Sequence, residues 1–296
     1  MAKQASPRPL ELTDLVCSVD PHDGSRLPVR QDAVLAALHE TKQRRAARLA
    51  RALPTRGEYL DEDAVDALLL RVHAELQRLG EELQLPRRLA ETLRSWSGPL
   101  LTAPSAGPVR VVDVGCGLGH VVRWLAAHDF LGPRVELVGV DLNATLVAHA
   151  ASLADQEGLR CRFVTGNAFT PGVAVEDPER TIIISSGLLH HIAPDELPGF
   201  FAAHEVLGVS AFAHFDVDPS RWATVGAWVF HQARMREPIS RHDGVLSARR
   251  AHPAQRLLAA AGSSAPGYEV RCHDAPRWQP ALAEVLRPIA GARRRA

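Results

Sequence analysis

The sequence lacks the usual marks of a metal cluster, a secreted protein or a membrane protein. Its 296 residues include four cysteines, and no two of them form a C-x-x-C pair, so no zinc or iron–sulfur site is encoded locally and no metal is expected. No apolar run reaches the roughly 18 residues of a membrane span, and the N-terminus has no apolar core of signal-peptide length. We therefore expect a soluble protein of the reducing cytoplasm, without membrane insertion.

The chain also lacks an excess of charge of either sign. Lysine and arginine together number 34, and aspartate and glutamate together also number 34. A chain with balanced charge has no overall field that would draw it to a polyanion. Nucleic acid is therefore not an expected partner.

Two phosphate-binding signatures are missing from the glycine-rich turn in VRVVDVGCGLGH, residues 109–120. This stretch places glycines at positions 115, 117 and 119 after an apolar run. A dinucleotide fingerprint needs a further glycine where His120 stands, and a P-loop needs a G-K-[ST] sequence that does not follow. The turn therefore either admits a ligand without a pyrophosphate or is a tight connection without any ligand.

The first third of the chain predicts helices. Residues 31–53 and the segment that begins after Leu60 carry apolar side chains at helical spacing, and the second opens with acidic residues suited to a helix N-terminus. The stretch SGPLLTAPSAGP, residues 97–108, concentrates glycine, proline and serine and is the best candidate linker. We expect an N-terminal helical segment over residues 1–105 and a second domain over residues 106–296.

Beyond the linker, short β-branched runs alternate with helical stretches. This alternation predicts an α/β fold with a mainly parallel sheet and helices on both faces. The run VSAFAHFDV extends the series, and GYEVRC and WQPALAEVL would supply a closing pair. The expected strands cover residues 109–114, 134–140, 161–166, 180–186 and 209–217, with the closing pair at 267–272 and 278–286.

The glycine turn resembles motif I of the class I S-adenosylmethionine-dependent methyltransferases, D-x-G-x-G-x-G, with Asp113 as its acidic residue. Three further segments match that family in the same order. LVGVDLN places Asp141 where the family's acidic residue binds the ribose hydroxyls, and VTGNAF matches the segment beside the adenine, with Asn167 in place of the usual aspartate. IIISSGLLHHI matches the exit of the fourth strand, at the methionine end of the cofactor. The resemblance, over residues 109–192, implies a Rossmann-like, seven-stranded fold and S-adenosyl-L-methionine as cofactor.

The resemblance also implies a set of cofactor contacts. A carboxylate at position 141 suits the ribose because it accepts hydrogen bonds from both hydroxyls at once. Alternatives without a ligand remain open: a tight strand–helix turn at the glycines, a helix cap at Asp141 and a turn residue at Asn167. The expected cofactor-binding residues are Asp113, Gly115, Cys116, Gly117, Gly119, Asp141, Leu142, Asn167, Ala168 and Ser185.

Histidines and an aspartate near the predicted strand ends are the candidate catalytic groups. Methyl transfer from a sulfonium is an in-line displacement, so a base is needed only when the acceptor must lose a proton, and histidine titrates in the right range. Of the adjacent pair His190 and His191, a structural role is expected more for His190. Asp216 alternatively forms a surface ion pair or caps the next helix. The candidates are His191, His214, Asp216 and His231.

A third cluster, WVFHQARMREPISRHDGVLSARRA, follows the fifth predicted strand. Its RHDGVLSARRA part is similar to a segment of bacterial methyltransferases that act on small, natural-product-like acceptors, in which it reaches back over the acceptor pocket. Arg241 and His242 are therefore expected to contact the substrate, with Asp243 beside them. A basic loop with an Asp-Gly turn is the alternative.

A motif that the sequence lacks narrows the class of acceptor molecules. SSGL stands after the fourth strand, where nucleobase amino-methyltransferases have an Asn, Asp or Ser followed by Pro-Pro and an aromatic residue. The expected function is S-adenosylmethionine-dependent methylation of a small-molecule acceptor with a hydroxyl, an amine or an activated carbon, as in secondary metabolism. A non-catalytic partner protein with this fold, and an NAD(P)-dependent oxidoreductase, are the alternatives. The N-terminal helices would cover the acceptor pocket, pack on the flank of the sheet or form a homodimer contact.

Overall fold

The computed structural model describes residues 8–20, 24–102, 107–219, 221–272 and 286–294, which divide into two compact units. Unit 1 takes in Met1–Asp20, Ser25–Glu75 and Pro219–Arg250, and unit 2 takes in Pro21–Gly24, Leu76–Asp218 and Ala251–Ala296. The predicted boundary after residue 105 does not coincide with this division, because the chain passes from one unit to the other more than once. The predicted roles of the N-terminal helices, as a cap or a dimer contact, stay predictions.

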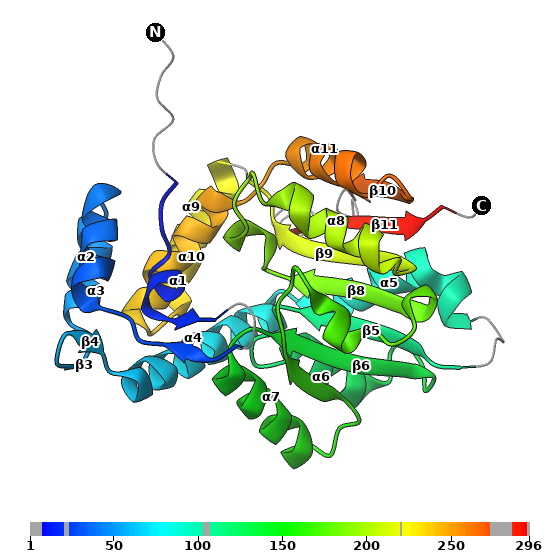
Figure 1. The fold of residues 1–296 in the computed structure, drawn as a ribbon, viewed down its shortest axis with the longest axis horizontal. Helices are drawn as coiled ribbons and strands as arrows, with labels where there is room; N and C mark the ends of the chain where they lie inside the picture. Colours follow the sequence, from blue (N-terminus) through cyan, green and yellow to red (C-terminus); the bar gives the residue numbers. More distant parts are fainter. Residues whose placement is uncertain (1–7, 21–23, 103–106, 220, 273–285, 295–296) are drawn as a thin grey trace, which may run out of the picture. The chain divides into compact units, whose positions relative to one another are not determined.

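Unit 1 consists of helices and two short hairpins (Figure 1). Leu12, Leu38 and Leu69 enter its apolar core from three different helices, and Ile239 enters it from a segment far along the chain, which explains why residues 219–250 belong to this unit. Its elements are α1 (Leu12–Val16), β1 (Ser18–Val19), β2 (Arg26–Leu27), α2 (Gln31–Glu40), α3 (Arg44–Arg51), β3 (Thr55–Arg56), β4 (Tyr59–Leu60), the first part of α4 (Glu62–Glu82), α9 (Arg221–Arg234) and α10 (Pro238–Arg250).

The single helix predicted over residues 31–53 is wrong, because two helices, α2 and α3, cover this segment. Lys42, between them, has a φ of 58°, in the left-handed region where a right-handed helix cannot continue. The break allows Leu38 of α2 and Ala50 of α3 both to be fully buried. Apolar spacing alone did not indicate this change of direction.

Unit 2 contains a seven-stranded sheet in the order β10-β11-β9-β8-β5-β6-β7 (Figure 1). Strand β11 is antiparallel to both of its neighbours, and the other strand pairs are parallel. The expected α/β fold with a mainly parallel seven-stranded sheet is therefore confirmed. The strands are β5 (Val109–Val114), β6 (Val135–Asp141), β7 (Arg162–Thr165), β8 (Thr181–Ser186), β9 (Ala211–Val217), β10 (Tyr268–Cys272) and β11 (Leu286–Arg293).

The five parallel strands begin and end within two residues of the predicted ranges. The first member of the closing pair, GYEVRC, is confirmed as β10. The second prediction, residues 278–286, lies outside the described residues except at Leu286, where β11 begins.

Helices cover both faces of this sheet. Because successive side chains of a strand point to opposite faces, neighbouring strand residues lie in different cores. Val111 and Ile182 lie in one core with residues of α5 (Leu85–Thr102) and α6 (His120–His128), whereas Val112 and Ile183 lie in the other with residues of α8 (Leu197–Leu207) and α11 (Ala254–Ser264). The other described helices of unit 2 are the last part of α4, helix α7 (Ala144–Gln156) and the short 3₁₀ turns η1 (Pro171–Ala174), η2 (Pro178–Arg180) and η3 (Leu189–His191). Within the described ranges, no helix is both long and apolar enough to cross a membrane.

Helix α5 runs through the first half of the predicted linker. Gly98 and Pro99 predict a break, yet the helix continues to Thr102. Leu89 and Leu93, earlier in the same helix, are at most 1% exposed in the core under the sheet. Packing of this kind outweighs weak local helix propensity.

The chain reverses its path across the sheet at β5. From β5 it continues to β6 and β7 on one side, and then returns to β8 on the other side. In open α/β sheets, ligands bind in the crevice outside the carboxyl ends of the strands at such a switch point. In unit 2 this point brings together the glycine turn after β5 and the segment 186–191 after β8.

Candidate active site

The glycine turn is a tight connection that only glycine can form. Gly115, Gly117 and Gly119 have φ values of 72°, 55° and 68°, in the left-handed region. The backbone N–H groups of Gly115 and Cys116 both donate to the carbonyl of Val140, at 2.8 and 3.1 Å. These bonds fix the turn against the end of β6.

Asp141, at the end of β6, lies directly beside this turn. Its Oδ2 accepts a hydrogen bond from the N–H of Gly117 at 2.8 Å, and its Oδ1 accepts one from the N–H of Asn143 at 2.9 Å. A carboxylate has about four acceptor positions, so it can accept further hydrogen bonds from a diol. The alternative role of Asp141 as a helix cap is wrong, because the side chain of Asn143 caps α7.

Asp113, at the end of β5, is a buried carboxyl group. Asp113 is 2% exposed, and within the described part of the chain its Oδ1 has no hydrogen-bond partner. Burial, together with the nearby charge of Asp141, raises the pKa of Asp113 to about 8. Burial and the two aspartates also raise the pKa of the Cys116 thiol, so this cysteine is not a nucleophile at neutral pH.

Replacing Asp113 by asparagine should change how stability depends on pH. The folded protein holds a proton on Asp113 at pH values where the unfolded chain does not, so the stability of the wild type falls as pH rises from about 4 toward 8. Relative to Asp113→Asn, the unfolding free energy of the wild type should fall by about 2 kcal/mol between pH 6 and pH 7.5. Urea unfolding at both pH values measures this. Parallel changes in the two proteins would contradict it, and exposed Asp155→Asn is the matched control.

Asn167, Ala168 and Leu142 lie at the same edge of the sheet and are partly buried. The side-chain oxygen of Asn167 accepts a hydrogen bond from the N–H of Phe169 at 2.9 Å, which is the turn role considered as its alternative. A carbonyl oxygen has a second lone pair, so this bond is compatible with an adenine contact. That contact stays a prediction.

Ser185 turns into the protein instead of toward the glycine turn. It is fully buried, and its hydroxyl lies 2.9 Å from Nδ1 of His214. The prediction that Ser185 contacts the cofactor is not supported by this geometry, because strand alternation points its side chain into the core covered by α8. Ser186, the next residue, ends the strand and is partly exposed.

His214 belongs to a buried hydrogen-bonded chain rather than to an open site. Its Nε2 lies 3.1 Å from Nε2 of His204, whose Nδ1 donates to the carbonyl of Phe200 at 2.9 Å. These partners require that Nε2 of His214 donates and that its Nδ1 accepts from Ser185. Burial lowers the pKa of His204 to about 4, and burial and His204 lower the pKa of His214 well below its ordinary value. The geometry therefore does not support His214 as a catalytic base.

The buried histidine pair should make the protein sensitive to acid. The unfolded chain takes up protons on histidine near pH 6.5, whereas folded His204 resists protonation down to about pH 4, so stability is lost as pH falls through this window. Between pH 6.5 and 4.5 we expect His204 to account for about 2 kcal/mol of lost unfolding free energy. Urea unfolding of His204→Gln should lack this part of the loss. His149→Gln, at an exposed helix position, should keep it.

Asp216, at the end of β9, holds His190 of η3 by two hydrogen bonds. Oδ2 accepts the backbone N–H of His190 at 2.7 Å, and Oδ1 accepts Nδ1–H at 2.8 Å. Burial works to raise the pKa of Asp216, but its charge interaction and hydrogen bonds with His190, and the N–H of Val217, hold it below its ordinary value. Asp216 is therefore an ionised carboxylate, and it does not form the surface pair considered as its alternative.

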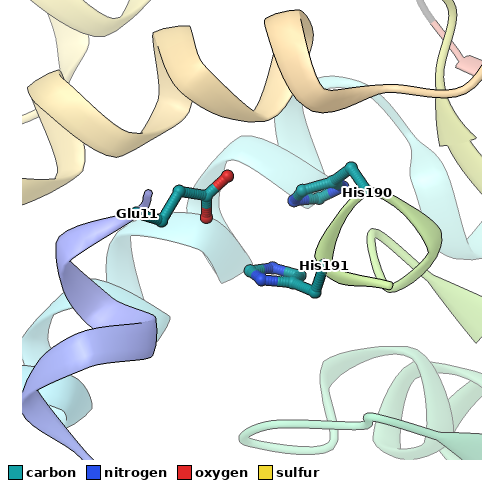
Figure 2. Close-up of side chains that lie close together, drawn as sticks. All are labelled: Glu11, His190 and His191. Carbon is teal, nitrogen blue, oxygen red and sulfur yellow. The ribbon is translucent and has the colours of Figure 1, made fainter. Parts of the chain in front are cut away.

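His191 lies on the same turn as His190, and Figure 2 shows both rings. Their ring centroids are 4.3 Å apart. His190 is 6% exposed and oriented by a carboxylate, which the sequence did not predict. An aspartate at the end of the next strand, 26 residues later, was the available signal for this pair. A catalytic role for His191 stays a prediction.

The other predicted site residues, His231, Arg241 and His242, all lie in unit 1. His231 of α9 is 6% exposed, its Nδ1 donates to the carbonyl of Ser240 at 3.1 Å, and burial lowers its pKa. Arg241 donates to the carbonyl of Met235 at 2.6 Å. Each of these groups has a structural partner within its own unit, and their predicted roles in catalysis and substrate binding stay predictions.

The Asp-Gly turn proposed as an alternative for the third cluster is wrong, because α10 continues through it. Asp243 accepts hydrogen bonds from the N–H groups of Leu12 and Thr13, at 3.1 and 2.9 Å, and so caps the start of α1. Its Oδ1 also accepts Nδ1–H of His242 at 2.8 Å. These contacts are ones that hold unit 1 together.

Comparison with known proteins agrees with this geometry. A family model described as a methyltransferase domain matches residues 111–208, which begin in β5 and end after α8. Residues 111–208 are therefore similar to a methyltransferase domain. This match, together with the fold, confirms the resemblance to class I methyltransferases, and S-adenosylmethionine is the methyl donor that this family uses.

Individual relatives of the methyltransferase domain are distant. The ribosomal RNA small subunit methyltransferase C of Alcanivorax borkumensis is 34% identical over 64 residues, which make up 22% of this chain and 18% of that protein. The match thus spans less than a fifth of this curated relative. The plantazolicin methyltransferase BamL, solved with a triazolic desmethylPZN analog and SAH, has a TM-score of 0.55 at 13% identity, over 75% of this chain and 91% of BamL. This likeness shows the fold. Magnesium protoporphyrin IX methyltransferase from Synechocystis PCC 6803 has a TM-score of 0.49 at 15% identity, over 89% of this chain and all of that one.

Proposed function

We propose that this chain is an S-adenosylmethionine-dependent methyltransferase that acts on a small-molecule acceptor. The observation that carries the proposal is the position of Asp141, whose two oxygens are fixed by the N–H groups of Gly117 and Asn143 at the switch point of the sheet. A carboxylate held in this way is oriented before any ligand arrives, which reduces the cost of binding.

The residues at the turn fit the methyl donor. A Cβ at Gly115 would lie 2.9 Å from Cδ1 of Leu188, so the backbone there is closely surrounded by the segment after β8. Oδ1 of Asp113 is buried and has no hydrogen-bond partner among the residues that the structure describes. This atom and the remaining acceptor positions of Asp141 are groups that a cationic ligand with a diol would satisfy. When bound, S-adenosylmethionine would supply an electrophilic methyl group. Asp141 would hold the ribose, and the glycine turn would admit the amino-acid end.

Two features of the chain favour a small acceptor. Charge is balanced at 34 residues of each sign, so there is no overall attraction to a nucleic acid. The exit of β8 reads Ser185, Ser186, Gly187, Leu188, without the Pro-Pro-aromatic sequence of nucleobase amino-methyltransferases. BamL, which shares the fold, is a plantazolicin methyltransferase that was solved with a triazolic desmethylPZN analog. This neighbour agrees with a small-molecule acceptor for the present chain.

Transfer of a labelled methyl group tests the proposal. The full chain would be incubated with S-adenosylmethionine carrying a labelled methyl group and with an extract of the cells that contain its gene. Mass spectrometry should find a small molecule heavier by one labelled methyl group, and the product should be missing with Asp141→Ala. Label found only in the RNA or the protein fraction, or in no fraction, would contradict the proposal.

A further inference from the structure

We infer that His190 and Asp216 form a general-base pair, and that the acceptor is therefore a hydroxyl compound whose proton His190 removes. This inference rests on the proposed methyltransferase function and concerns the same site. It reverses the roles expected from the sequence, in which His190 was the structural member of its pair.

The geometry of the pair matches what a general base requires. Asp216 binds both the backbone N–H and Nδ1–H of His190, at 2.7 and 2.8 Å, so the turn and the ring are held by one carboxylate. Because Nδ1 donates to Asp216, Nε2 is the ring nitrogen that can take up a proton. His190 and Asp216 are 6% and 5% exposed, so their hydrogen bonds lie in surroundings of low dielectric, where a hydrogen bond is stronger than in water.

The pair also lies at the correct end of the sheet. Asp216 is near the carboxyl end of β9, and His190 follows the carboxyl end of the adjacent strand β8. The N–H of Gly187 donates to the carbonyl of Phe215 at 2.8 Å, which ties the exits of the two strands together. Leu188, two residues before His190, is the side chain that a Cβ on Gly115 would meet. The His190–Asp216 pair and the glycine turn thus border the same switch point.

The chemistry balances without any further reactant. The acceptor oxygen forms a bond to the methyl carbon while its proton moves to Nε2 of His190. The carbon–sulfur bond of the donor breaks, and its electron pair stays on sulfur. Asp216 stabilises the imidazolium until its proton passes to solvent, so His190 is a catalytic residue and Asp216 is a positioning residue.

A base of this kind selects among acceptor classes. A neutral amine attacks through its lone pair and can lose its proton after transfer, whereas an alcohol or a phenol is a poor nucleophile until its proton leaves. Phenols keep their proton at neutral pH, because their ordinary pKa is about 10. The pair is therefore most useful for a hydroxyl acceptor.

Three para-substituted acceptors of similar shape test the inference: 4-methylphenol, 4-nitrophenol at a pH where it is ionised, and 4-methylaniline. His190→Asn keeps an amide N–H toward Asp216 but removes the basic nitrogen, and Asp216→Asn removes the charge. Both variants should lower kcat for 4-methylphenol about 100-fold with little change in KM, and should leave the rate with 4-nitrophenol within about twofold. His149→Gln is the matched control, because His149 is exposed and its Nδ1 bonds to the Thr145 carbonyl of its own helix.

A second readout does not depend on turnover. Nitrogen-15 chemical shifts of His190 in the complex with S-adenosylhomocysteine should show a protonated Nδ1 and an unprotonated Nε2. The opposite tautomer, equal losses with both phenols, or methylation of 4-methylaniline alone would overturn the inference. If the wild type binds S-adenosylhomocysteine and His190→Asn methylates 4-methylphenol at the wild-type rate, then the general-base role of His190 is contradicted while the proposed function is not. If the wild type binds no S-adenosylhomocysteine and methylates no acceptor, the proposed function fails.

Discussion

Gly119→Ala is expected to destabilise the protein by about 4 kcal/mol, which is a large part of the stability of an ordinary domain. Two costs add up at this position. Gly119 has a φ of 68°, and an alanine in this left-handed conformation costs roughly 1 kcal/mol. Its Cβ would also lie 2.2 Å from Cε1 of Phe163, a clash that is worth about 3 kcal/mol. Urea unfolding monitored by circular dichroism measures the change.

The Phe163 ring cannot move aside to relieve this clash. A Cβ at Gly139 would lie 2.4 Å from Cδ1 of the same ring, so two glycines on neighbouring segments form a slot for it. Gly158→Ala is the matched control, because Gly158 has a φ of 65° but no atom within 4 Å of a Cβ. It should cost only about 1 kcal/mol. Phe163→Val should recover part of the stability of Gly119→Ala, and equal costs at positions 119 and 158 would contradict the slot.

Asp141→Ala is expected to weaken the binding of S-adenosylhomocysteine at least 100-fold, or about 3 kcal/mol. The substitution removes the acceptor for the ribose hydroxyls. It also releases the N–H groups of Gly117 and Asn143, which the carboxylate now orients at 2.8 and 2.9 Å. Equilibrium dialysis with labelled S-adenosylhomocysteine measures the affinity.

The control for Asp141→Ala is Asp155→Ala, which removes an exposed carboxylate from the nearby helix α7. It should leave the affinity unchanged, because a surface charge contributes little. Equal affinities for the wild type and Asp141→Ala, in proteins with the same unfolding transition, would show that the donor does not lie at this carboxylate.

The strands and the turn of unit 2 could be predicted because their signals are local. A β-branched run, glycines at every second position and an acidic residue at the next strand end all depend on a few neighbouring residues. The sequence therefore placed Asp113, Gly117 and Asp141 together. It could not show that Asn143, rather than Asp141, caps α7, because both residues precede the helix by a few positions.

The surroundings of the candidate catalytic residues depend on tertiary packing, which no local sequence pattern indicates. His214 and Asp216 lie on the same face of β9, and the pattern gave both the same role. The side chains of α8 bury His214 next to Phe200, while Asp216, two residues further on, reaches the strand end and His190. Similarly, no local signal places residues 219–250 in unit 1, because that assignment rests on contacts with segments more than 150 residues away.

The most direct test of the account is a crystal structure of the full chain grown with S-adenosylhomocysteine. We expect the ribose hydroxyls on the carboxylate of Asp141, the amino-acid end along the turn from Gly115 to Gly119, and the sulfur on the side of the sheet where His190 and Asp216 lie. Electron density for the ligand at any other part of the chain, or none at a saturating concentration, would contradict the proposed methyl-donor site.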